Sequence, residues 1–192
     1  MSPDLDQIAL DRAARAREKV AALLAPKNIV IAGASDKGHS WSRSAFRNLK
    51  KYGFPGPIYP FNPGRDDVWG ERCYRSFDAL PEKPDHVVVV VPAPHVTPLI
   101  EDAAKHGARS ATIFTAGFDE AEGADAAKLT TRLRETIART GLAVSGPNCL
   151  GNLAAPSKLM TMTDNRSHDM LPGPVAIIAG SGGVGKIGRA HV

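Results

Sequence analysis

The sequence is poor in the features that mark disulfide-rich, metal-binding or membrane proteins. Its only two cysteines, Cys73 and Cys149, lie far apart and show no metal-binding spacing, so we expect no metal site and a reduced, cytoplasmic setting. No apolar run approaches the ~20 residues that a membrane-spanning helix needs. The first twenty residues are too charged for a signal peptide. We therefore expect no membrane partner.

Charge of one sign is also scarce. The 24 basic and 20 acidic residues give a net charge of +4 that is spread along the chain, and aromatic residues make up 6%. No arginine-rich patch interleaved with aromatic residues is present, so a nucleic-acid partner is not expected. A length of 192 residues suits one full domain, or one domain plus part of another.

The most informative stretch runs from residue 27 to residue 52. Asn28 to Ala32 is a short apolar run that predicts a buried strand, and Trp41 to Tyr52 has helical spacing. The glycine-containing polar turn between them places backbone N–H groups and a helix N-terminus together, which predicts an anion site for a nucleotide-like cofactor. The alternative is an ordinary strand-to-helix turn without a ligand. The candidate ligand-binding residues here are Gly33, Ala34, Ser35, Lys37 and Ser40.

The spacing disfavours NAD as the cofactor. The dinucleotide fingerprint is G-x-G-x-x-G, followed by an acidic residue ~20 positions later, but Ser35 occupies the place of the second glycine. The next predicted strand, residues 58–61, ends in Asn62 and Pro63 without a carboxylate. We count Asn62 and Arg65 in this turn as candidate ligand residues. An exposed arginine that is merely solvated is the alternative for Arg65.

The rest of the chain alternates between strand and helix patterns. Five consecutive valines within residues 85–91 predict a strand covered on both faces, as in a parallel sheet with helices on each side. The fold class is therefore predicted to be α/β, a Rossmann-like, doubly wound, mostly parallel sheet. A helix over residues 5–24 should end before Pro26 and pack its apolar stripe against this domain. Further strands are predicted at 109–114 and 142–144, and helices up to 106 and over 119–140.

Small-residue turns follow the later strands as well. In a parallel sheet these turns all lie at the carboxyl edge, where ligands bind. Together they would let a long, thin ligand lie close to the backbone. The candidate residues in them are Val91, Pro92, Ala93 and Pro94, then Thr115, Ala116, Gly117 and Phe118, and finally Asn148 and Cys149.

With these turns, the chain resembles the CoA-binding domain of the NDP-forming acyl-CoA synthetases, the superfamily of the succinyl-CoA synthetase α subunit and ADP-forming acetyl-CoA synthetase. The similarity covers about residues 24–185. It implies that Ser35 and Lys37 lie by the CoA phosphates, Arg65 by an adenosine-side phosphate, and Asn148 and Cys149 toward the thiol end. The motifs are G-A-S-D-K at 33–37, I-Y-P-F-N-P-G-R at 58–65, V-P-A-P at 91–94, T-A-G-F at 115–118 and G-P-N-C-L-G at 146–151.

The resemblance also implies a reaction that this stretch would not complete. The family transfers a phosphoryl group from ATP to a histidine, forms an acyl phosphate from a carboxylic acid, and passes the acyl group to CoA. That histidine lies in a following flavodoxin-like domain, and the Mg–ATP site lies in an ATP-grasp domain or subunit. The chain is thus expected to bind CoA without catalysis. Its predicted parts are a helix (1–26), the CoA-binding domain (27–152), a linker with the first strand of a second domain (153–185) and a non-native tail (186–192).

Other interpretations of the chain stay open at this point. Residues 180–186 match G-x-x-x-x-G-K, but Ile187 stands where a P-loop has Ser or Thr, so an ATP site there is disfavoured. Residues 186–192 resemble the translation of a sequencing adaptor. A stand-alone CoA-binding regulatory module is the main alternative to a ligase, and a CoA-responsive protein acetyltransferase is the third hypothesis.

Overall fold

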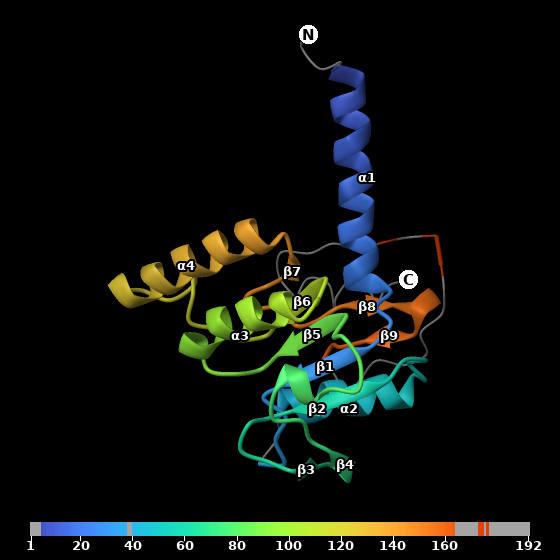
Figure 1. Ribbon diagram of the computed structural model, residues 1–192, viewed down its shortest axis with the longest axis vertical. Helices are drawn as coiled ribbons and strands as arrows, with labels where there is room; N and C mark the ends of the chain where they lie inside the picture. Colours follow the sequence, from blue (N-terminus) through green and yellow to red (C-terminus); the bar gives the residue numbers. More distant parts are fainter. Residues whose placement is uncertain (1–4, 38–39, 164–172, 175, 177–192) are drawn as a thin grey trace.

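The computed structural model describes residues 5–37, 40–163, 173–174 and 176. Its centre is a five-stranded sheet in the order β2-β1-β5-β6-β7 (Figure 1). All four pairings are parallel, so the predicted doubly wound α/β fold is confirmed. The strands are β1 (Ile29–Ala32), β2 (Ile58–Phe61), β5 (His86–Val89), β6 (Ser110–Ile113) and β7 (Ala143–Ser145).

Helices cover both faces of the sheet because alternate strand residues are apolar on both sides. Val30, Val87 and their neighbours pack with α3 (Ala93–Lys105) and α4 (Ala124–Thr140). Ile29, Ile31 and Val88 pack on the opposite face with Leu49 of α2 (Trp41–Lys51). Figure 1 shows α3 and α4 together on one side and α2 on the other.

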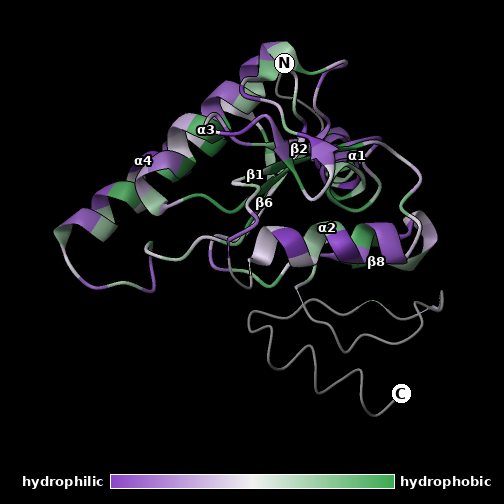
Figure 2. Cartoon of the chain, turned by 90° about the horizontal axis from the view of Figure 1, so that it is seen from below, coloured by the Kyte–Doolittle hydropathy of each residue, from purple (hydrophilic) through white to green (hydrophobic). Residues whose placement is uncertain are grey.

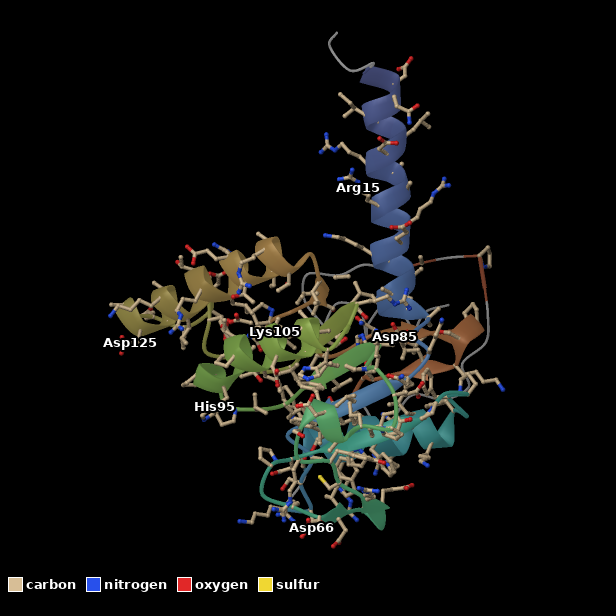
Figure 3. The ribbon with its side chains drawn as sticks, in the orientation of Figure 1. Arg15, Asp66, Asp85, His95, Lys105 and Asp125 are labelled. Atoms are coloured by element: carbon tan, nitrogen blue, oxygen red, sulfur yellow. The ribbon has the colours of Figure 1, made fainter. Side chains whose placement is uncertain are left out.

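Helix α1 (Leu5–Leu24) does not pack against the domain along its length. The prediction that its apolar stripe would be buried there was wrong. It projects from the body (Figure 1), and Arg15 extends away from the sheet (Figure 3). Leu10 and Val20 are 64% and 53% exposed, whereas Ala22 in the last turn is buried. Only this end of the helix reaches β6 and β7. No helix in the described part of the chain combines the length and apolarity needed to cross a bilayer.

Residues 153–163 form a hairpin on the α2 face of the domain. It comprises β8 (Leu153–Ala154), the 3-10 turn η2 (Ala155–Ser157) and β9 (Leu159–Met160). Both β9 side chains are fully buried, and the Asn48 side chain donates to the Met162 carbonyl at 2.6 Å. The sequence suggested a domain boundary at residue 152 with a linker from residue 153. In the structure, residues 153–163 pack onto the domain, and the boundary itself stays a prediction. The predicted second domain and the tail lie outside the described residues, apart from 173–174 and 176.

Smaller elements differ from expectation in detail. Helix α4 begins at Ala124 rather than at residue 119. Helix α3 contains Pro98 in its interior. After β2 the chain forms a short antiparallel pair, β3 (Asp67–Val68) and β4 (Glu71–Arg72), and the 3-10 turn η1 (Phe77–Ala79).

A buried polar chain crosses the middle of the sheet. The His86 imidazole is fully buried, with Nδ1 2.8 Å from the Ser110 hydroxyl and Nε2 3.0 Å from the Thr112 hydroxyl. Ser110 donates its only proton to the Ala22 carbonyl at 2.6 Å, so Nδ1 must carry the proton that Ser110 accepts. Nε2 then accepts from Thr112, whose oxygen accepts from the Asn152 amide at 2.9 Å. This chain joins the base of α1 to the residue that ends the 146–152 loop.

The amino end of the sheet is closed by a separate ion pair. Asp85, labelled in Figure 3, is bonded by the Arg109 guanidinium and by the Lys27 N–H. Burial acts to raise the pKa of the Asp85 carboxyl, but the bonds from Arg109 and Lys27 outweigh it and lower the pKa. This pair lies at the opposite edge from the small-residue turns.

Candidate functional site

The carboxyl ends of the five strands lie at one edge, and the strand order reverses between β1 and β5. Such a reversal opens a crevice in which doubly wound proteins bind ligands. The turn over residues 33–37 stands there, and the Gly33 and Ala34 N–H groups donate to the Phe61 carbonyl at 3.0 and 3.2 Å. Gly33 has φ +88°, and a Cβ there would lie 2.3 Å from the Val90 carbonyl oxygen. Only glycine lets the two strands end this close together.

Two cations accompany this turn. The Lys37 side chain is exposed, and its backbone N–H donates to the Ser35 hydroxyl oxygen at 3.1 Å. Arg65 reaches across from the turn after β2 and pairs with Asp36 at 3.5 Å. Lys37 and Arg65 therefore come from the turns after two neighbouring strands, β1 and β2.

The side chain of Asn62, in the turn after β2 as predicted, is bonded within the protein. Its amide nitrogen donates to the Ala34 carbonyl at 2.9 Å, and its amide oxygen accepts the Gly64 N–H at 2.9 Å. Both ends of the side chain are thus bonded within the protein. The amide ties the turn after β1 to the turn after β2.

Ser40 immediately precedes α2 and caps it only through its backbone conformation. Its hydroxyl is bonded to the hydroxyl of Ser42 rather than to a backbone N–H of the first helical turn. Residues 38 and 39 lie outside the described residues.

The turns after β5 and β6 contact each other. Helix α3 begins directly after Pro92, and the Thr115 hydroxyl donates to the Val91 carbonyl at 2.7 Å. Ala116 is exposed at the surface of the edge, whereas the Phe118 side chain is fully buried in the core. Phe118 can therefore present only its backbone to a ligand.

The loop after β7 lies beside the turn that follows β6. The Asn148 N–H donates to the Thr115 carbonyl at 3.0 Å. The Cys149 thiol shares its single proton between the Ile113 carbonyl at 3.3 Å and the Ser145 carbonyl at 3.6 Å. Burial, the largest influence on it, raises the pKa of the Cys149 thiol, so this sulfur is a neutral donor rather than a thiolate.

Three residues that shape the edge were missed in the sequence. The Trp69 indole N–H donates to the Ser35 carbonyl at 3.1 Å, and its backbone N–H donates to Asp36 at 3.3 Å. Asp36 also neutralises Arg65. Glu120 accepts the N–H groups of Gly117 and Phe118. Asp36 lies within the quoted motif at 33–37 and Glu120 follows the one at 115–118, so acidic residues in or beside glycine turns were the available signal, whereas nothing local marked Trp69.

A shallow groove of about 570 Å³ lies on the outer face of α2, next to Trp69. Its walls are mostly basic, and Figure 2 shows the hydrophilic character of this helix. It lies on a helix face, and Trp69 connects it to the turn 33–37, because the Trp69 indole N–H donates to the Ser35 carbonyl. Within the described residues, no group of three His, Cys, Asp or Glu side chains is arranged to hold a metal ion.

Comparison with known proteins shows the family to which this chain belongs. Residues 27–155 match the model of the CoA binding domain family. The α subunit of acetate–CoA ligase (ADP-forming) I of Pyrococcus furiosus is 34% identical over 168 residues, which are 85% of this chain and 36% of that protein. The 4-hydroxybutyrate–CoA ligase (ADP-forming) of Nitrosopumilus maritimus is 33% identical over 162 residues, 84% of this chain and 23% of the relative.

A solved structure shows the same relation. The acetyl-coenzyme A synthetase 1 of Ca. Korarchaeum cryptofilum, determined in complex with phosphate and ADP, matches with a TM-score of 0.79 and 34% identity. The match covers 90% of this chain and 36% of that one.

These findings define a class: the protein carries a Rossmann-like fold of the CoA-binding type. The chain belongs to the CoA binding domain family and is homologous to ADP-forming acid–CoA ligases. It spans about a third or less of the length of these relatives.

Proposed function

We propose that CoA lies across the carboxyl edge with its phosphates at the turn 33–37. The observation that carries this proposal is that Lys37 and Arg65 lie in the turns after two neighbouring strands, with Arg65 pairing at 3.5 Å with Asp36, the residue before Lys37. From there the pantetheine arm would pass the turns 91–94 and 115–118. Its thiol would end near Asn148 and Cys149, consistent with the contact between these turns.

The side chains suit an anionic ligand in distinct ways. The Ser35 oxygen accepts the Lys37 N–H, so its hydroxyl proton is free to donate to a phosphate oxygen. Arg65 would exchange Asp36 for a phosphate, which binds a guanidinium more strongly than one exposed carboxylate does. We assign Asn62 to ordering the two turns, and Phe118 to contributing backbone alone.

For the whole protein we propose an NDP-forming acid–CoA ligase that makes acyl-CoA from a carboxylic acid, CoA and ATP. The Mg–ATP site, in an ATP-grasp domain or subunit, and the phosphorylated histidine would lie outside residues 27–163. The named ligase relatives support this proposal. The chain as given would then bind CoA without forming acyl-CoA.

Titration calorimetry with CoA, dephospho-CoA and NAD tests the site. We expect CoA to bind tightest and NAD hardly at all. Lys37→Ala and Arg65→Ala should each weaken CoA binding about 10- to 100-fold, because a charge-assisted contact contributes ~1.5–3 kcal/mol. Lys19→Ala is the matched control, since Lys19 is an exposed cation on α1, away from the edge. NAD binding equal to CoA, or an equal effect of the control, would contradict the proposal.

A further inference from the structure

The turn after β6 aims two backbone N–H groups at a single oxygen. Gly117 N–H and Phe118 N–H both donate to Oε1 of Glu120, the latter at 3.3 Å. The bond from Gly117 is the main cause that lowers the pKa of the Glu120 carboxyl. Paired N–H groups of this kind form a nest that favours an anionic oxygen. In this structure, that oxygen belongs to a side chain of the same turn.

The nest is held by the core rather than by Glu120. Phe118 is fully buried, and the Thr115 hydroxyl is bonded to the Val91 carbonyl. Gly117 has φ +104°, and a Cβ there would lie 3.2 Å from the Ala93 Cβ. The direction of both N–H groups is therefore set by packing and by the glycine. Removing the Glu120 carboxylate would leave the two donors in place.

The Glu120 side chain, by contrast, is not held by the core. Its side chain is exposed, and among the described residues its carboxylate is paired with no cation. It lies in the irregular segment between Gly117 and the start of α4 at Ala124. An exposed carboxylate bonded only to backbone N–H groups of its own turn can be exchanged for a free one at little cost.

We propose that the Gly117 and Phe118 N–H groups bind a carboxylate oxygen of the acid substrate, which displaces Glu120. The inference rests on the proposed function for its biological setting. The nest contacts the turn 91–94 on one side, and Thr115 accepts the Asn148 N–H on the other. An acid bound there would lie next to the proposed thiol end of CoA. Two neutral donors without a cation suit a monoanionic carboxylate better than a dianionic phosphate.

The test uses ¹⁵N-labelled protein and follows the Gly117 and Phe118 amide resonances during titration with acetate. We expect Glu120→Ala to show a saturable shift of both resonances with a millimolar Kd. The wild type should need about twofold more acetate, because the tethered carboxylate competes at an effective concentration of the order of millimolar, similar to the expected Kd. Glu122→Ala, which removes an exposed carboxylate of the same segment, should behave like the wild type.

Several outcomes would overturn the proposal. These are no saturable shift in Glu120→Ala with acetate up to the order of 100 mM, an equal shift with uncharged acetamide, or tighter binding of inorganic phosphate than of acetate. A parallel CoA titration separates the two ideas. CoA binding without acetate binding would remove the acid subsite alone, and acetate binding without CoA binding would remove the proposed function alone.

Discussion

Acidification should weaken this fold through one imidazole, that of His86. The ring is fully buried between two hydroxyl groups, and its burial lowers the pKa to about 4 from an ordinary value of 6.5. At a pH between these two values, the imidazole of His86 is protonated in the unfolded chain but neutral in the folded chain. The free energy of unfolding should therefore fall as the pH falls from about 6.5 to about 4, and level off below. A gap of roughly 2.5 pKa units corresponds to about 3 kcal/mol.

Other groups change the free energy of unfolding with pH in the opposite direction, or over another pH range. The lowered pKa of Asp85 makes its contribution disappear only below about pH 4, where the unfolded carboxyl takes up its proton. The pKa of His106 is raised, mainly by its bond to the Asp102 carbonyl and then by Asp78, so its contribution increases as the pH falls. The His86 effect must therefore be isolated by comparison with a variant.

The assay is urea denaturation of wild type and His86→Gln at several pH values from about 4.5 to 7.5. The variant should be less stable at neutral pH, yet its stability should depend less on pH by up to about 1.4 kcal/mol per pH unit. His95→Gln, a change at an exposed position of α3, should retain the wild-type slope. Equal slopes for wild type and His86→Gln would refute the reasoning. So would an imidazole ¹⁵N spectrum showing the His86 proton on Nε2.

Further predictions concern hydroxyls and a glycine. Thr112→Val should lower the free energy of unfolding by about 1–3 kcal/mol because His86 loses its hydrogen-bond donor. Thr130→Val should be nearly neutral, since the buried Thr130 hydroxyl has no hydrogen-bond partner. Chemical denaturation compares the two variants, and equal losses of stability would contradict the assignment. Gly33→Ala should cost roughly 2–4 kcal/mol because its Cβ meets the Val90 carbonyl. Gly70→Ala, at φ +76° in open space, isolates the cost of the backbone angle; thermal unfolding that shows the same loss in both would exclude the steric cause.

The sequence predicted the sheet because its signals are local. The valine run, the glycines after the strands and the proline near the start of α3 each act within a few residues. The prediction that α1 packs against the domain failed because an apolar stripe indicates that one face of a helix is buried but does not identify what covers that face. The hairpin at 153–160 was missed since two-residue strands carry no periodicity.

For the candidate site, the position of the edge was predictable and the use of its side chains was not. Parallel strands bring their following turns together, so residues 33–37 and 115–118 fall at one edge by topology alone. Whether an amide faces a ligand or its own backbone depends on contacts between turns distant in sequence, as Asn62 shows. The burial of Phe118 and the reach of Trp69 to Ser35 are likewise products of tertiary packing.

Helix α1 is fixed at one end only, and two side-chain hydrogen bonds from the domain hold that end. The Ala22 carbonyl accepts from Ser110 of the sheet, and the Leu24 carbonyl accepts from Ser157 of the hairpin. From this anchor the helix extends for 20 residues, about 30 Å at 1.5 Å per residue. It therefore acts as a lever arm: a rotation of about 10° at the base carries the Leu5 end through about 5 Å. A rearrangement of the Ser110–His86–Thr112 hydrogen bonds that turned the base by this angle would displace the far end enough for solution scattering or a paired distance label to measure.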